Sequence, residues 1–314
     1  MRCYACGRDT DELFDGRYGS LVCQRCFDEM YAHCADCGTL CDRHTRYQND
    51  DSEQLCHSCW ARTFTWRPTV VSTRGPSDRV GSGRCFGLEL ETSACDGYKD
   101  IRNQIVFGAK QDCSVDGMEF DSPILHGNRG LDHVRQFCKL ARKMGFRVDR
   151  RCGFHIHMDM RRTTKKQRHA IIYAYRLTYK IWESMVCADR RNKSWCHAPD
   201  STLAEIREID DIDEYCYDSD RYEFVNCLAY ATHGTFEIRG YQGTLNAVVI
   251  CNWIRAHLRF VDAVQDKSLD ELDELFGKPR RALQNLRRII GATLSRFYAC
   301  DWRLSNLTRQ VSMV

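Results

Sequence analysis

The sequence contains no long apolar run. No segment approaches the roughly 18 consecutive apolar residues that suggest a membrane-spanning helix. The N-terminus, which begins MRCYAC, also lacks the apolar core of a signal peptide. A strong charge is missing too, since 46 basic and 43 acidic residues give a formal net charge of +3, which is too small to indicate a nucleic-acid partner by itself. We therefore expect a soluble, cytoplasmic protein with no membrane partner. Its 314 residues can form one large domain and something smaller.

Cysteine, in contrast, is abundant and unevenly placed. Nine of the 20 cysteines fall within the first 59 residues, mostly in Cys-x-x-Cys pairs. A secreted disulfide framework could use this many cysteines, but zinc binding in a reducing compartment explains the pairs better. The pairs repeat with an offset of 31 to 33 residues. The two predicted ligand sets are Cys3, Cys6, Cys23 and Cys26, and then Cys34, Cys37, Cys56 and Cys59.

Each set offers four thiolates, which complete a tetrahedral structural zinc site. We therefore predict two zinc-ribbon or treble-clef-like modules over residues 1–61. Cys41 and His44 lie between the halves of the second unit and leave its fourth ligand open. A segment of about 60 residues with few aliphatic side chains cannot build a core alone, so zinc is expected to hold it together. Docking of a protein or a nucleic acid is the alternative role, and scattered acidic residues make nucleic acid the weaker of the two.

The segment 62–84 is rich in Thr, Ser, Pro and Gly and contains five arginines. Such a composition is typical of a flexible linker. We place the large domain at residues 85–314.

Three strand-like segments of this domain, at 87–91, 153–157 and 235–239, each carry two polar side chains two residues apart. Residues i and i+2 of a strand point to the same face, and the apolar residue between them points to the other. If the three strands share a sheet, their polar pairs form one floor of carboxylates, imidazoles and a guanidinium. The pairs are Glu89 and Glu91, His155 and His157, and Glu237 and Arg239.

The whole domain alternates between strand-like and helix-like patterns. Strands are expected over 86–92, 118–124, 146–160, 222–230 and 235–241, with a glycine-rich turn at 127–130 and a hairpin at His233-Gly234. Helices are expected over 131–145, 163–187, 245–264 and 279–297. This mixture indicates an α+β fold with an antiparallel sheet, in which helices cover one face and the other face holds the polar pairs.

The polar pairs suit a hard divalent cation. Glutamate oxygens without cysteine favour Mg²⁺ or Mn²⁺ over zinc, and Mg²⁺ usually completes its shell with water and nucleotide phosphates. An arginine on the same face could clamp a phosphoryl group through two contacts. Metal ions and an arginine around phosphate oxygens are the usual means of phosphoryl transfer.

Four motifs in this order resemble the amidoligase family. They are FGLELE at 86–91, DCS at 112–114 with GMEF at 117–120 and SP at 122–123, GFHIHMD at 153–159, and GTFEIR at 234–239 followed by GTL at 243–245. Amidoligases are carboxylate–amine ligases with a glutamine synthetase-like fold, related to the glutamate-cysteine ligases. The resemblance covers about residues 84 to 265. It implies an ATP-dependent ligase that makes an isopeptide or peptide-like amide bond through an acyl phosphate.

The resemblance also implies the metal ligands. Glu91 and Glu119 would hold one Mg²⁺ or Mn²⁺, and Glu89, His155 and Glu237 would hold the second. Glutamine synthetase has two glutamates in its middle segment, where this chain has Glu119.

By the same resemblance Arg239 contacts the ATP phosphates, and Asn226 and Arg221 are further polar site residues. We expect His157 to face the substrate or to support the metal shell. Arg190 and Arg191 follow a predicted helix, and we expect them to stabilise its C-terminus, although a substrate carboxylate could bind them.

Two other functions fit part of the pattern. The spacing of His155, His157 and Asp159 is that of some metal-dependent hydrolases, although Met160 stands where a further histidine is expected. The chain could also be a zinc-finger binding protein whose large domain does not catalyse. The substrates of a ligase stay open among amino acids, polyamines, peptides and proteins, and a homo-oligomer is a further expectation.

We predict two zinc ions per chain, bound within residues 3 to 59. Elemental analysis of the purified protein should give about two zincs, and chelation should unfold the N-terminal module because metal binding and folding are one event there. The large domain should keep its structure. Fewer than about one zinc per chain would rule the prediction out.

Overall fold

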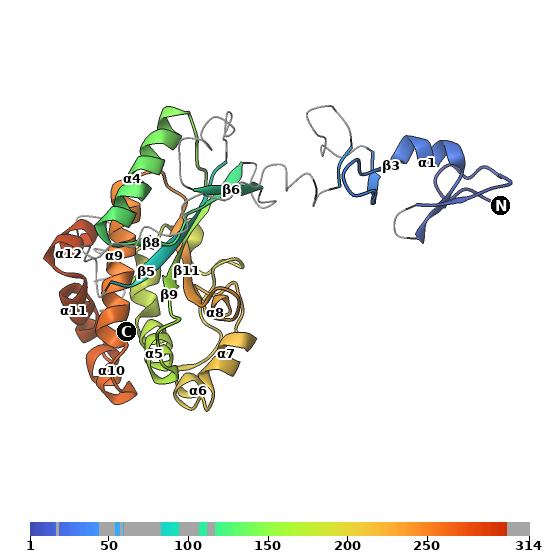
Figure 1. The fold of residues 1–314 in the computed structure, drawn as a ribbon. Helices are drawn as coiled ribbons and strands as arrows, with labels where there is room; N and C mark the ends of the chain where they lie inside the picture. The colour runs from blue at the N-terminus through green and yellow to red at the C-terminus, as the bar shows by residue number, and fades with distance from the viewer. Residues whose placement is uncertain are drawn as a thin grey trace. The chain divides into compact units, whose positions relative to one another are not determined.

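A computed structural model of the chain describes residues 1–16, 19–43, 54–56, 59, 83–93, 107–111 and 117–299. Contacts divide the chain into two units, Met1–Trp66 and Arg67–Val314 (Figure 1). Most of the predicted linker, His44 and the DCS motif lie outside the described residues. The boundaries at residues 61 and 85 therefore stay predictions.

The N-terminal unit consists of small elements around the cysteines. Strand β1 (Phe14–Asp15) pairs with β2 (Leu21–Val22), helix α1 (Gln24–Met30) follows, and β3 (Tyr31–His33) pairs with β4 (Leu40–Asp42). Its buried clusters are tiny and are built largely from cysteine, with Val22, Tyr31 and Leu55 as their buried members of other types. Such clusters bury too little apolar surface to hold a fold without an added staple.

The second unit is built on one antiparallel sheet. Among the described residues seven strands form it, in the order β10-β11-β9-β5-β7-β6, with β8 paired to β5. Their bounds are β5 (Cys85–Glu91), β6 (Gly108–Gln111), β7 (Met118–Asp121), β8 (Leu125–His126), β9 (Gly153–Asp159), β10 (Val225–Asn226) and β11 (Thr235–Gln242). The predicted α+β class with an antiparallel sheet is confirmed.

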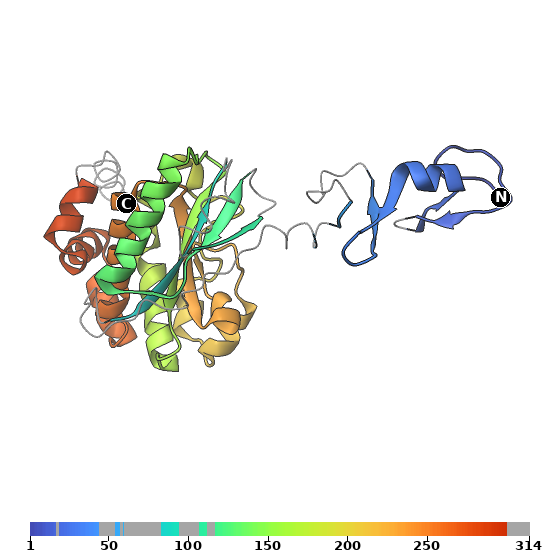
Figure 2. The ribbon, with the colours of Figure 1, turned by 45° about the horizontal axis from the view of Figure 1, so that its top comes forward.

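One face of this sheet is apolar and is covered by helices. Leu88, Phe154, Ile156 and Phe236 are almost completely buried. Three long helices lie on this side, α4 (Gly127–Lys143), α5 (Lys165–Ser184) and α9 (Ala247–Val264) (Figure 2). The polar pairs are thereby left to the opposite face, as the sequence predicts.

Aromatic side chains join the helices to each other and to the sheet. Trp182 of α5 meets Trp253 of α9 edge to face at 5.6 Å and stacks on His257 at 4.1 Å. Trp253 in turn lies 4.6 Å from the ring of Tyr241 on β11. Burial lowers the pKa of His257 well below its usual value, so this histidine is a neutral core residue bonded to the Tyr175 hydroxyl.

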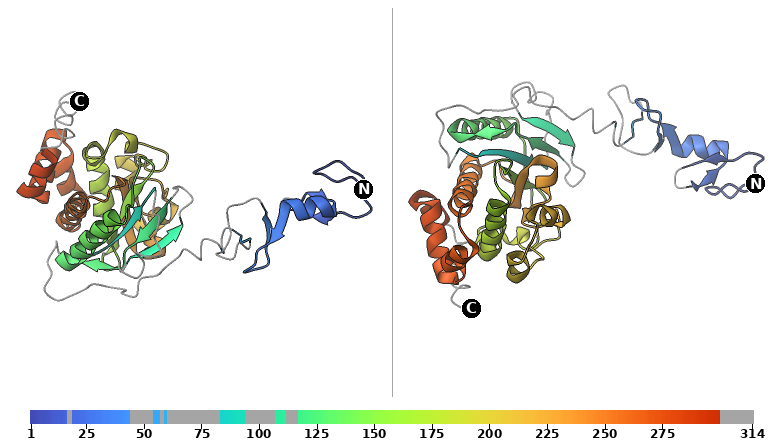
Figure 3. Two further views of the ribbon diagram at one scale, coloured as in Figure 1. Left: turned by 90° about the horizontal axis from the view of Figure 1, so that it is seen from above. Right: turned by 60° about the horizontal axis from the view of Figure 1, so that its bottom comes forward.

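Shorter helices complete the unit. They are α6 (Leu203–Arg207), α7 (Ile212–Asp218), α8 (Ala229–His233), α10 (Leu269–Phe276), α11 (Pro279–Ile290) and α12 (Ala292–Ala299), with a 3₁₀ turn at Ala188–Arg190. Helices α10, α11 and α12 lie beyond α9, farther from the sheet (Figure 3). None of the described helices is long and apolar enough to cross a bilayer.

Several predicted elements were wrong in their extent. The expected turn at 127–130 is the first turn of α4, and Gly130 is needed there because a Cβ would lie 2.9 Å from that of Leu125. The strand expected over 146–160 is confined to β9. The strand expected over 118–124 ends at Asp121, before Pro123, which cannot donate a ladder hydrogen bond.

The C-terminal half needs two more corrections. The strand expected over 222–230 is only β10, because α8 forms before the chain reverses at Gly234, whose φ of 66° is left-handed. The helix expected over 279–297 is broken into α11 and α12 at Gly291, where φ is 88°.

The aromatic packing predicts a stability contrast. Trp182→Ala should lower the free energy of unfolding by about 3–5 kcal/mol, because it leaves a large cavity beside Trp253 and His257. Tyr217→Ala, at a side chain that is 69% exposed, is the control and should change it by less than about 0.5 kcal/mol. Urea unfolding followed by far-ultraviolet circular dichroism makes the comparison. Equal effects would contradict the assigned core.

Candidate active site

The sheet register brings the predicted polar pairs onto one face. Glu89 of β5 lies opposite His155 of β9 on one side and Asp121 of β7 on the other. The remaining pairs are Glu91 with Glu119, Glu237 with His157, and Lys110 with Glu119. Directly opposed residues in antiparallel strands have their Cβ atoms about 5 Å apart, so their carboxylates and imidazoles come within contact distance.

Glu89 is the centre of this face. Its carboxylate lies 3.0 Å from His155 Nδ1 and 3.2 Å from His157 Nε2, and the same His155 nitrogen is 3.0 Å from Glu237 Oε1. Burial opposes charge on all these groups, but the hydrogen bonds between them outweigh it. They raise the pKa of His155 to about 9, lower that of Glu237 to about 2 and lower that of Glu89 well below its usual value. His157 Nδ1 is held 2.9 Å from Thr235 Oγ1.

A second carboxylate group lies on the other side of Glu89. Burial, and then repulsion by Glu89, raises the pKa of Glu119 to about 9, and burial also raises that of Asp121. Lys110 Nζ lies 2.6 Å from Glu119 Oε1 and 3.2 Å from Asp121 Oδ2. Asp121 Oδ1 is buried and accepts no hydrogen bond from any described residue. At neutral pH Glu119 is therefore largely protonated, and a divalent cation bound at this carboxyl would displace its proton.

Two sets of side chains can each hold a divalent cation. In each set the donor atoms lie within 4.8 Å of one another, and the sets are Glu89, His157 and Glu237, and Glu89, Glu119 and Asp121. Carboxylate oxygens with at most one imidazole suit Mg²⁺ or Mn²⁺, and the orphaned Asp121 oxygen fits the same reading. Glu89 belongs to both sets.

The geometry groups the predicted ligands somewhat differently from the family analogy. Both histidines reach Glu89, so His157 is placed as favourably for a metal as His155. Glu91 is turned away from Asp121, because its Oε2 accepts the Gly153 amide hydrogen at 2.6 Å. Its other oxygen is 3.8 Å from His155 Nε2, where it can support that ring.

Asp121 was missed by the sequence reasoning. It is two residues after Glu119 on β7, so the alternation rule that selected the three other pairs would also have selected this one. With Glu119 it gives β7 two carboxylates, in the segment where glutamine synthetase has two glutamates.

Two arginines lie beside these ligands. Arg239 Nη1 is 2.6 Å from Glu237 Oε1, and Arg190 Nη2 donates to the Arg239 carbonyl at 3.1 Å. The Nε atoms of both are buried and donate to no described residue. Gly153 makes room for Arg190, because a Cβ there would lie 2.7 Å from its Nη2. Two adjacent guanidiniums with unused donors favour an anionic ligand.

The sequence had favoured a helix-capping role for both Arg190 and Arg191. Arg191 does donate to the Ser184 and Val186 carbonyls at the end of α5. Arg190 does not cap that helix and instead lies in the wall of the site.

Asn226 and Gly240 keep Glu237 and Arg239 in place. Asn226 Nδ2 donates to Glu237 Oε2 at 2.6 Å, and its Oδ1 accepts from Ala229 N at the start of α8. The pairing of β11 with β9 shifts register between Ile238 and Tyr241, which marks a β-bulge. Gly240 sits in this bulge, where a Cβ would overlap Phe224 at 1.8 Å.

Two cavities meet at the carboxylates. The larger, of about 960 Å³, is here called the cationic cavity, and its basic lining residues besides Lys110 are Arg150, Arg151, Arg190, Lys193, Arg221 and Arg239. Trp195 and Tyr222 also line it and are 43% and 42% exposed. The smaller, of about 530 Å³, is here called the mixed cavity, and it is lined by Asp121, Asp159, Thr235, Pro123 and Ile124 among others. Glu89, Lys110 and His233 line both.

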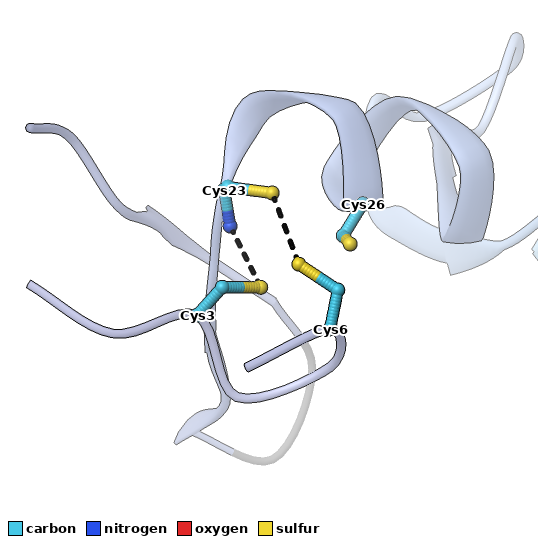
Figure 4. Close-up of side chains that lie close together, drawn as sticks. All are labelled: Cys3, Cys6, Cys23 and Cys26. Atoms are coloured by element: carbon cyan, nitrogen blue, oxygen red, sulfur yellow. Dashed lines mark hydrogen bonds between the residues drawn. The ribbon is translucent and has the colours of Figure 1, made fainter. Parts of the chain in front are cut away.

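The four cysteines of the first predicted set turn their sulfur atoms toward one another (Figure 4). The sulfurs of Cys6 and Cys23 are 3.8 Å apart, close to the edge of about 3.8 Å that a tetrahedral site with Zn–S bonds of about 2.3 Å requires. Amide hydrogens of Cys23 and Cys6 lower the pKa of Cys3 to about 6, which favours the thiolate that a metal needs.

The second set is alike. Cys34, Cys37, Cys56 and Cys59 form one group, with Cys37 and Cys56 sulfurs 3.7 Å apart. Cys41 stands outside this group and its thiol is bonded to the Thr39 carbonyl. The described cysteines form no disulfide bonds with one another. Both groups can therefore hold a tetrahedral ion.

The fold and the site define an α+β protein with a carboxylate-lined face whose side chains can hold metal ions. A family model described as "Putative amidoligase enzyme" matches residues 36–261, more than two thirds of the chain. The chain belongs to this amidoligase family, as its motifs suggested. A comparison with curated proteins gave no match.

The shared position of Glu89 predicts how metal binding responds to substitution. With a non-hydrolysable ATP analogue present, Glu89→Gln should weaken both Mn²⁺ sites, whereas Asp121→Asn should weaken one, because only Glu89 belongs to both sets. Electron paramagnetic resonance counts the bound Mn²⁺. The exposed Asp132→Asn, which lies outside every candidate metal-binding group of the described residues, is the control and should behave as wild type. Loss of both sites in Asp121→Asn would contradict the division into two sets.

Proposed function

We propose that the protein is an ATP-dependent carboxylate–amine ligase with a glutamine synthetase-like fold, which forms an isopeptide or peptide-like amide bond. The observation that carries the proposal is the position of the carboxylate face, between a cationic cavity on one side and a mixed cavity on the other. A ligase of this kind must hold a polyanionic nucleotide and an acceptor carboxylate against the same metal ions. Family membership supports amide-bond formation as the reaction.

The cationic cavity is suited to ATP. Arg190 and Arg239 offer paired donors that are short of acceptors, which matches phosphate oxygens. Trp195 and Tyr222 present exposed rings in the same cavity, and such rings can stack on a base. Arg221 sits at this rim, with its guanidinium 5.4 Å from the centre of the Tyr222 ring, so we assign it to nucleotide contact rather than to catalysis.

The reaction then has two steps. A substrate carboxylate oxygen attacks the γ-phosphorus, the bond to the β-γ bridging oxygen breaks, and ADP leaves with an acyl phosphate formed. The amine nitrogen attacks the acyl carbon, phosphate leaves, and the amine proton passes to a base or to water. When bound, Mg²⁺ or Mn²⁺ would neutralise the phosphate oxygens of the nucleotide.

The side chains of this chain divide the remaining work. Asn226 and Arg239 fix the two oxygens of Glu237, so that its charge cannot rotate away from the centre of the face. Arg239, in contact with Glu237 and lining the cationic cavity, is placed to follow the negative charge that moves from the γ-phosphoryl group to ADP. Glu91 and the Gly153 amide hold β5 and β9 in register behind His155.

The mixed cavity is suited to the acceptor side. It reaches the carboxylate face from the end opposite the arginines, and its basic residues Lys110 and Arg161 are already paired with acids. An amine or a zwitterionic substrate therefore meets little net positive charge there. The substrate classes are an amino acid, a peptide or a protein, each of which can supply the amine or the carboxylate, and a polyamine, which can supply only the amine.

The hydrolase alternative loses support in this geometry. Asp159 accepts from the backbone and guanidinium of Arg161 and belongs to no metal-binding group of the described residues. The His-x-His-x-Asp spacing therefore does not become a single ligand set.

For the N-terminal unit we propose two structural zinc ions. A protein that carries the acceptor carboxylate or amine is the partner we favour for it, with nucleic acid as the alternative. A homo-oligomeric state is part of the same proposal, as it is for the related synthetases.

Phosphate release from ATP tests the proposed reaction. The full-length protein is mixed with Mg²⁺, ATP and pairs drawn from amino acids, polyamines and peptides, and the products are weighed by mass spectrometry. A ligase releases phosphate only when both partners are present and yields a product lighter than their sum by one water. Product formation without ATP consumption, or ATP hydrolysis alone across the whole set, would argue against it.

The site predicts a turnover defect for Glu237→Gln. The change keeps the shape of the side chain but removes a charge needed most in the transition state, so turnover should fall by about a hundredfold or more while nucleotide affinity falls less. Arg239→Lys should be similarly severe, because an ammonium cannot reproduce a planar two-point contact. Arg280→Lys, at an exposed position of α11 that lines neither cavity, is the control and should lose little. Full activity in Glu237→Gln would remove this residue from the metal site.

A further inference from the structure

Lys110 is not an ordinary surface lysine paired with an exposed acid, because it contacts two carboxylates of the candidate active site. It is on β6, at the edge of the sheet, directly opposite Glu119 in the register. Its ammonium group lies between Glu119 and Asp121, at 2.6 Å and 3.2 Å. These are two of the three carboxylates that can hold the second divalent cation. Lys110 thus uses the oxygens that a metal ion would need.

A lysine ammonium and a divalent cation cannot share these oxygens at low cost. Charges of +1 and +2 that lie about 4 Å apart in a partly buried site repel each other strongly. The lysine must therefore move when the metal enters, or the metal is excluded while the lysine stays.

The surroundings allow this side chain to move. The Lys110 side chain is 39% exposed, whereas that of Arg239, the cation beside the other metal-binding set, is 11% exposed. Arg239 contacts only Glu237 of the first metal-binding set, whereas Lys110 contacts both Glu119 and Asp121 of the second. Lys110 therefore blocks more of its set, and it must move farther for a metal ion to bind there. Lys110 lines both cavities, so rotation of its flexible side chain can move the ammonium group toward the cationic cavity without a clash with packed side chains.

We propose that Lys110 competes with the divalent cation for the Glu89, Glu119 and Asp121 set, and that bound nucleotide ends the competition by offering Lys110 a phosphate instead. The inference rests on the proposed ligase function. Its consequence is an order of assembly: the set with Glu237 takes a metal ion alone, and the set with Asp121 is filled only together with ATP. Before nucleotide binds, Lys110 pairs with Glu119 and Asp121 and keeps their oxygens in place; after nucleotide binds, it contacts a phosphate.

Mn²⁺ binding measured by electron paramagnetic resonance tests this order. The zinc-loaded full-length protein is titrated with and without a non-hydrolysable ATP analogue, as wild type, Lys110→Met and Lys110→Arg. Wild type and Lys110→Arg should bind one Mn²⁺ without the analogue and two with it. Lys110→Met should bind two in both conditions, with the affinity of the second site raised at least about tenfold without nucleotide. Affinity for the analogue should fall in Lys110→Met.

Lys193→Met is the matched control, since Lys193 also lines the cationic cavity but contacts neither acid. Without the analogue it should bind one Mn²⁺, as the wild type does, and a gain equal to that of Lys110→Met would overturn the inference as a general charge effect. Two Mn²⁺ ions on the wild type without nucleotide, or identical counts in wild type and Lys110→Met, would also overturn it and leave the proposed function standing. No Mn²⁺ on the wild type in either condition would overturn both.

Discussion

The site depends on the hydrogen-bonded register of three strands. Because β5, β9 and β11 pair with Glu89 opposite His155 and Glu237 opposite His157, six polar side chains reach one face. A slip of one residue in either pairing would send its strand's polar side chains into the helical layer and its apolar side chains into water. The buried aromatic contacts of α5 and α9 stabilise this register, since they fit only one face of the sheet. The core thus holds the carboxylate face in alignment.

The same alignment concentrates charge that the protein alone does not balance. Five carboxylates, of Glu89, Glu91, Glu119, Asp121 and Glu237, gather around two histidines, Lys110 and Arg239. Burial, and then repulsion by Glu89, raises the pKa of Glu119 within this group. Sharing Glu89 between two ligand sets couples them, because an ion in one set changes the charge felt in the other. By linkage the coupling acts equally in both directions.

Much of this could be predicted from alternation alone. The period-two pattern identified β5, β9 and β11 and their common face, and helical periodicity identified α4, α5 and α9. Asp121 obeys the same rule but lies at the last position of the short strand β7, where the sequence pattern does not show whether the strand continues that far. Lys110 could not have been found, since β6 has no alternating pattern and its place beside Glu119 is set by pairing. The start of α4 depends on close packing at Gly130, and the ends of α8 and α11 depend on the positive φ angles of Gly234 and Gly291. Only the folded chain reveals these features.

The bulge at Gly240 adds one residue to β11. Upstream of it Glu237 faces the ligand side and Ile238 the core, and one additional residue then returns Tyr241 to the core beside Phe154 and Trp253. Because Ile238 pairs with Ile156 and Tyr241 with Phe154, deleting residue 240 would give a regular ladder in which Tyr241 still faces the core. The deletion would instead remove the bend that a bulge gives its strand. The path of the chain beside Arg239, rather than the face that each half of β11 presents, therefore depends on Gly240.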